Sequence, residues 1–241
     1  MSRLVGYWFF PAMRFLLVST LLSFGLVTGQ ELVEPIPSEP VRPITESESR
    51  QFVIHGNELK VRSRLASMAE KVKDALVEQA GRGPVDPETG NTGWQHTVVV
   101  ELHGNPGDEE PSKLIVPGCY FLDDGFRLQL DLHLARGINR EVLERELLQL
   151  LIYERGLRDQ DPNEVPERIS VPAWLVDGLL ESIRWGRQEV DRDLYRALFE
   201  KNVVFPIDQL LKEDGVEDMD GATRVAYRVS SGALVLSLIH I

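Results

Sequence analysis

The residues with the clearest potential for chemistry lie in a helical pattern over residues 139–155. At about 100° per residue, Arg145, Glu146 and Gln149 fall in one sector of this helix, together with Tyr153. Apolar residues occupy most of the remaining circumference, so we expect the helix to be largely buried. Its polar sector must then face either water or a cleft.

A second helical pattern, over residues 173–187, carries the carboxylate of Asp177. If the two helices pack together, Glu146 and Asp177 could act as a metal-free acid–base pair, which leaves a hydrolase open as one function. The alternative without any site is an ordinary α+β domain with Trp174 in its core. The residues that open this helix form a recognisable string: Pro172, Trp174, Leu175, Asp177 and Gly178.

These two segments together resemble the gluzincin zinc metallopeptidases, in particular the peptidase MA-like group. In that family a helix with His-Glu-x-x-His follows the last strand of a sheet, and a helix with Pro-x-Trp-Leu-x-Glu-Gly comes next. The two histidines and the glutamate of the second helix bind zinc, and the glutamate beside the first histidine takes a proton from the metal-bound water. The resemblance spans residues 50–235 and implies a zincin-like α+β fold, in which a small mixed sheet precedes a helical half.

The family's ligand positions hold residues in this chain that are poor zinc ligands. The first histidine falls on Arg145, the second on Gln149, and the third ligand on Asp177. The general base falls on Glu146. Arginine stays protonated and has no lone pair for a metal, and an aspartate is one methylene shorter than a glutamate. We therefore expect a degenerate site with no bound zinc, no cofactor and no catalytic residue.

Arg145 could instead take the place that zinc has in active relatives. A guanidinium between Glu146 and Asp177 would substitute electrostatically for the ion and preserve the packing of the two helices. The simpler alternative is an exposed ion pair between Glu141 and Arg145, four residues apart, which contributes about 0.3–0.5 kcal/mol. The position of the guanidinium relative to Asp177 decides between the two.

The histidines and the single cysteine do not supply the missing ligands in any obvious way. None of the histidines on predicted strands or strand edges has a histidine four residues away on a helix: His55, His96, His103 and His133. Ligands from elsewhere, such as His133, leave a zinc peptidase open as a third function. Cys119 fits a buried apolar position.

Two further groups of residues have structural explanations. Ser230, Ser231 and Gly232 suit a small-residue helix contact better than a nucleophile, and with Tyr227 they also match the Tyr-x-x-Ser helix of similar peptidases. The acidic pair Asp123-Asp124 suits a tight turn better than a calcium loop, because the other acidic ligands are missing.

The first 29 residues have the pattern of a secretory signal. Arg14 precedes an apolar run over residues 15–27, and small residues end it. We expect cleavage after Gly29 and hence a secreted or periplasmic protein. The alternative is an uncleaved segment that anchors the protein in a membrane. Met13 is a second candidate for the start.

The next segment, residues 30–50, holds four prolines among Glu, Ser and Thr, so we expect a disordered linker. The folded, zincin-like domain is expected over residues 51–235. Residues 236–241 match a string that a common sequencing adapter encodes. We expect them to be an artefact, and the domain to be truncated.

The pattern of elements supports an α+β class. Strands are predicted at 52–55, 97–102, 114–116, 119–122 and 126–132, with one helix at 59–79. Helices are predicted afterwards at 139–155, 173–187, 190–201, 206–213 and 222–236.

The net negative charge excludes one class of binding partner. The chain of 241 residues has a formal net charge of -12, which repels phosphate backbones, so we expect no nucleic acid partner. Membrane contact is expected only if the signal segment stays attached. We therefore predict an exported, non-catalytic peptidase-like domain that acts by binding or assembly, with an unknown protein or cell-envelope partner.

Overall fold

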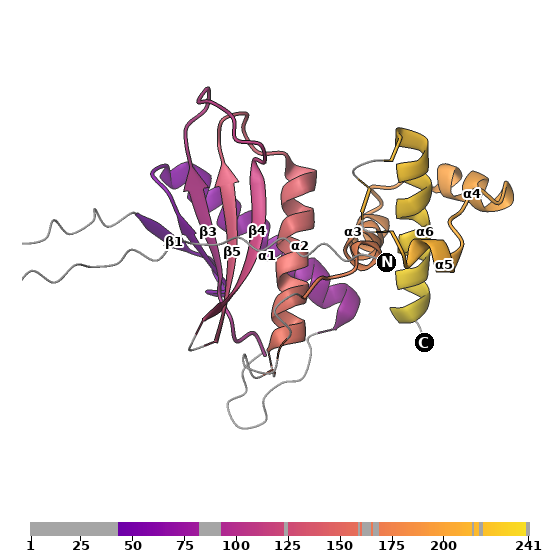
Figure 1. Cartoon of the computed structure of the whole chain (residues 1–241), viewed down its shortest axis with the longest axis horizontal. Coiled ribbons are helices and arrows are strands. Elements are labelled where there is room, and N and C mark those ends of the chain that lie inside the picture. Colours follow the sequence, from indigo (N-terminus) through magenta and orange to yellow (C-terminus); the bar gives the residue numbers. More distant parts are fainter. Residues whose placement is uncertain are drawn as a thin grey trace, which may run out of the picture. The chain divides into compact units, whose positions relative to one another are not determined.

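The computed structural model describes residues 43–239 apart from 82–92, 123–124, 159, 161–164, 166–168, 214 and 217–218. The predicted signal segment, most of the predicted linker and the Asp123-Asp124 turn therefore lie outside the described residues. Within these residues the chain forms a mixed α/β fold with a five-stranded sheet and six helices (Figure 1). The elements are β1 (Ile44–Glu46), β2 (Phe52–His55), α1 (Leu59–Ala80), β3 (Val98–His103), β4 (Ile115–Leu122), β5 (Gly125–His133), α2 (Arg140–Leu157), α3 (Ala173–Gly186), α4 (Arg192–Glu200), α5 (Ile207–Leu210) and α6 (Gly221–Ile239).

The sheet has the strand order β1-β2-β3-β5-β4. The central strands β2, β3 and β5 are parallel, and the edge strands β1 and β4 are antiparallel to their neighbours. Helix α1 connects the parallel neighbours β2 and β3, as a parallel pair requires a long crossover. Strands β4 and β5 form a hairpin, which leaves β4 at the edge beside α2.

The core forms on one face of this sheet, because apolar side chains alternate along its strands. The inward residues are almost fully buried: Phe52, Ile54, Val98, Val100, Leu128, Leu130 and Leu132. Apolar faces of α1, α2 and α3 pack against them in one continuous cluster. The apolar faces that the sequence predicts for the strands and the helices are thereby confirmed, and they pack against each other in one core.

Helix α2, which carries most of the candidate site, begins where the sequence predicts. Asn139 is its N-cap, and its side-chain oxygen accepts hydrogen bonds from the backbone of Glu141 at 3.0 Å and of Val142 at 3.3 Å. The prediction that Gly156 ends the helix is wrong, because α2 continues to Leu157. Leu157 is only 4% exposed, so the additional residue buries an apolar side chain.

Two predicted boundaries also need correction. Strand β1 lies inside the segment 30–50 that we expected to be a disordered linker, so the folded part begins before residue 51. Thr45 of this strand accepts a hydrogen bond from Nε of the buried Arg62 at 2.9 Å. Strand β1 thus gives the buried guanidinium a partner, which hydrophobic patterns in the sequence do not predict. The two short strands predicted at 114–116 and 119–122 form the single strand β4.

The C-terminal helices follow the sheet, as the α+β pattern predicts. Residues 236–239, where we placed the adapter-derived end, continue α6, and Val235 just before them is 2% exposed. None of the described helices has both the length and the apolar character needed to cross a membrane.

Candidate functional site

A cleft of about 710 Å³ separates the first half of α2 from the edge strand β4. One wall comes from residues 110–117, and the floor comes from α2 and the first turn of α3. Arg145, Glu146 and Gln149 all line this cleft, so the polar sector predicted for the helix faces a hollow. Asp177 does not line it and is 5% exposed behind Arg145.

The guanidinium of Arg145 contacts both carboxylates of the predicted site. Its Nε donates to Asp177 Oδ1 at 3.0 Å, and its Nη1 donates to Glu146 Oε1 at 3.0 Å. The predicted position of Arg145 between the two is therefore confirmed. The alternative pairing with Glu141 is wrong, since Glu141 lies 3.1 Å from Arg184 and 2.9 Å from Arg228 instead.

Burial and charge act in opposite directions on this pair. Burial by itself lowers the pKa of Arg145, but Asp177 and Glu146 outweigh it, so the net pKa is raised. Burial raises the pKa of Asp177, and the attraction of Arg145 does not fully offset it. The second oxygen of Asp177, Oδ2, is buried and has no hydrogen-bond partner among the described residues. Asp177 is thus a carboxylate with one of its two oxygens satisfied.

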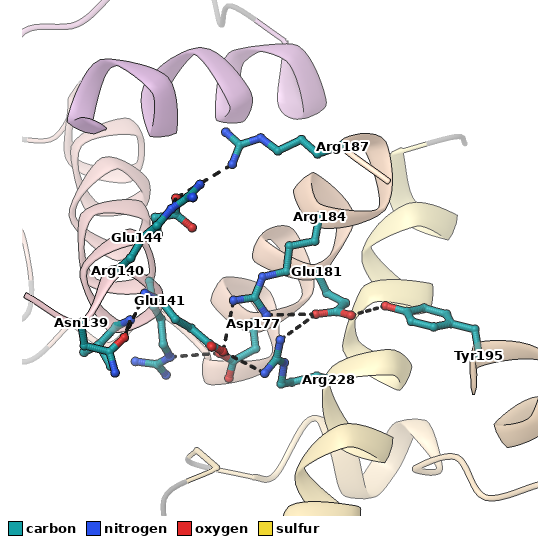
Figure 2. A network of polar contacts seen from close by, with 12 residues as sticks. Asn139, Arg140, Glu141, Glu144, Asp177, Glu181, Arg184, Arg187, Tyr195 and Arg228 are labelled. Atoms are coloured by element: carbon teal, nitrogen blue, oxygen red, sulfur yellow. Dashed lines mark hydrogen bonds and ion pairs between the residues drawn. The ribbon is translucent and has the colours of Figure 1, made fainter. Parts of the chain in front are cut away.

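A wider network of ion pairs lies close to this pair, and its charges act on Asp177 (Figure 2). Glu181, one helical turn after Asp177 on α3, is 7% exposed. It lies 3.6 Å from Arg184 and 3.1 Å from Arg228, and it accepts a hydrogen bond from the hydroxyl of Tyr195 on α4. Burial and this contact with Glu181 raise the pKa of Tyr195. The network connects α2, α3 and α6 through charged groups and reaches α4 through the neutral hydroxyl of Tyr195.

Helices α3 and α6 approach each other closely at small residues. A Cβ added to Gly178 would lie 2.5 Å from the carbonyl oxygen of Ser231. A Cβ added to Gly232 would likewise lie 3.1 Å from Cγ of Glu181. The predicted small-residue contact at residues 230–232 is confirmed, and Ser230 hydrogen-bonds to the backbone of Phe205 at 2.9 Å.

Tyr227 of α6 is fully buried and has its ring against Phe205. Burial, followed by the nearby charge of Asp177, raises the pKa of Tyr227 to about 12. Its hydroxyl therefore stays protonated at neutral pH.

The histidines lie where the sequence places them, on strands or strand edges. His55, His103 and His133 end β2, β3 and β5, and His103 Nε2 lies 2.9 Å from Asp131. None of these histidines lines the cleft. Across the part of the chain that the structure describes, no three His, Cys, Asp or Glu side chains are grouped closely enough to hold a metal ion. Cys119 is half-buried in β4, and burial raises the pKa of its thiol.

Comparisons with family models, with curated proteins and with solved structures gave no match for this chain.

Sequence reasoning missed the outer part of the network. The signal was present, because Asp177, Glu181 and Arg184 are spaced by four and three residues and must share one face of α3. The partners Tyr195 and Arg228 come from α4 and α6, at distances in the sequence that no spacing rule connects.

Proposed function

We propose that this chain is an exported, non-catalytic peptidase-like domain that acts by binding or assembly, and that its cleft between α2 and β4 is the recognition surface. The observation that carries the proposal is Arg145, whose guanidinium is bonded to Glu146 and Asp177 at 3.0 Å each. A zincin-like arrangement would place the metal at this position. Export rests on the predicted signal segment.

The same contacts argue against the metal-free hydrolase. A general base must be free to accept a proton from its substrate. Here Glu146 accepts from Arg145, and Asp177 lies behind Arg145 with 5% exposure. Glu146→Gln tests this alternative. If the wild type and the variant hydrolyse peptides and esters only at the background rate, the binding domain is supported. If the wild type is active, its rate follows the titration of a carboxylate and the substitution lowers that rate, the binding domain is overturned.

The first test of the proposal is the zinc content of the purified protein after dialysis against trace zinc. We expect a zinc-to-chain ratio near zero in a protein whose circular dichroism shows it to be folded. About one tightly held zinc per chain would overturn the ligand assignment, and peptidase assays would then follow.

A second experiment tests the zincin-like geometry by restoring its ligands. The triple variant Arg145→His, Gln149→His and Asp177→Glu puts two imidazoles one helical turn apart, facing the carboxylate that Arg145 already reaches at 3.0 Å. We expect it to bind one zinc per chain and to unfold at a higher temperature with zinc than without, because metal bound only to the native state stabilises it.

The matched control replaces both Arg145 and Gln149 by alanine and keeps Asp177→Glu. This control removes the same side chains but offers no imidazole, so zinc should not change its unfolding temperature. If the triple variant is folded and behaves like this control, α2 and α3 do not have gluzincin geometry.

A further inference from the structure

A second site candidate lies along α1 and shares only Gly137 with the lining of the cleft that holds Arg145. Two adjoining hollows, of about 300 Å³ and 520 Å³, share Arg64, Met68 and Arg140 as lining residues. They form one groove between α1, the start of α2 and the segment after α3. The proposed function uses neither hollow.

The smaller hollow is mainly apolar. Its apolar lining comes mainly from α1 and from the turn before α2: Val61, Leu65, Met68, Leu134 and Ile138. The charged residues Glu58, Arg64 and Arg140 also line it. Its volume lies at the lower end of the range for small-molecule sites, about 300–1,000 Å³. A methylene group is about as large as a water molecule, which occupies about 30 Å³. The hollow therefore accommodates roughly ten carbons, which is one acyl chain and not two.

The larger hollow is basic, although the whole chain has a net charge of -12. Its lining holds four cations and two carboxylates: Arg64, Lys71, Arg140 and Arg187, with Glu144 and Glu189. The buried Glu144 orients two of these cations, since it lies 2.8 Å from Arg140 and 4.0 Å from Arg187. Among residues that the structure describes, neither Arg64 nor Lys71 has an ion-pair partner for its side chain.

We infer that this groove binds a single-chain anionic amphiphile of the fatty-acid class. The acyl tail lies in the apolar hollow, and the anionic head lies near Arg64 and Lys71, two helical turns apart on one face of α1. A peptide fits less well, because the apolar hollow offers few partners for backbone amides, and an unpaired buried amide costs free energy. A two-chain phospholipid exceeds the volume of the apolar hollow.

Titration calorimetry with dodecanoate, dodecyl phosphate and the uncharged dodecyl maltoside tests this inference, each below its micelle concentration. We expect both anions to bind the wild-type protein and the maltoside to bind more weakly. Dodecanoate and dodecyl phosphate distinguish a carboxylate from a phosphate head. The double variant Arg64→Glu/Lys71→Glu should weaken binding of both anions by at least about tenfold, which corresponds to about 1.4 kcal/mol.

The matched control is Lys60→Glu/Lys201→Glu, which changes the net charge equally at exposed positions outside both hollows. It should bind dodecanoate as the wild type does. A third variant, Val61→Trp, fills the apolar hollow from a half-buried position and should abolish binding while the protein remains folded. The inference is overturned if the wild type binds neither anion, if the charge reversal leaves affinity unchanged, or if an acidic apolar peptide binds more tightly than dodecanoate.

Discussion

Replacing Arg145 with methionine should lower the free energy of unfolding by about 3 kcal/mol at neutral pH. Methionine replaces the methylene stem of arginine by an unbranched apolar side chain but removes the cation between Glu146 and Asp177. Asp177 is 5% exposed, and one of its oxygens already has no hydrogen-bond partner among the described residues. Without Arg145 its buried charge becomes uncompensated. The contribution of Arg145 is smaller than for a fully buried pair, since its side chain is 23% exposed.

The deficit should depend on pH in a defined direction. Burial raises the pKa of Asp177 above its ordinary value of 3.8, and the loss of Arg145 removes an interaction that lowers it. Nearby Arg184 still lowers the pKa and Glu181 still raises it. Between the unfolded and the folded pKa the native state binds more protons than the unfolded state, so stability falls as pH rises through this window. The deficit should therefore be small near the unfolded pKa and largest at neutral pH.

Urea unfolding of the wild type and of Arg145→Met across this pH range measures the effect. The control adds Asp177→Asn to the Arg145→Met background. Because the neutral amide carries no charge to desolvate, the double variant should recover much of the loss and lose most of the pH dependence. A deficit that is constant with pH would show that Arg145 acts through packing alone.

Replacing Gly178 with alanine should destabilise the protein by about 3 kcal/mol. The added Cβ would lie 2.5 Å from the Ser231 carbonyl oxygen and 2.6 Å from Val235 Cγ2. The carbonyl belongs to the backbone of α6 and Val235 is 2% exposed, so neither atom can move aside without shifting the helix. Overpacking of this kind forces α3 and α6 apart.

The matched control is Gly156→Ala in α2. A Cβ at this helical glycine meets no atom within 4 Å, so alanine should stabilise the protein slightly, by about 0.5–1 kcal/mol. Thermal unfolding of the two variants compares the same chemical change in an open and in a closed position. Equal effects at both sites would contradict the close α3–α6 contact.

The sequence by itself determined most of the elements and one side of the site. A β-rich run identified β2, and local periodicity identified β5 and α1. Asn139 marked the start of α2, because capping depends on neighbours within a few residues. The same periodicity placed Arg145, Glu146 and Gln149 in one sector of α2. It could not recognise β1, whose three residues become a strand only through pairing with β2.

Only the tertiary structure decided which charges meet. From spacing alone, Arg145 could pair with Glu141 on its own helix or with Asp177 on the next, and the packing of α2 on α3 selected Asp177. Glu141 was thereby left to Arg184 and Arg228, which come from two other helices. Ion-pair partners depend on distances of a few ångström between distant segments, and local sequence patterns carry no information about those distances.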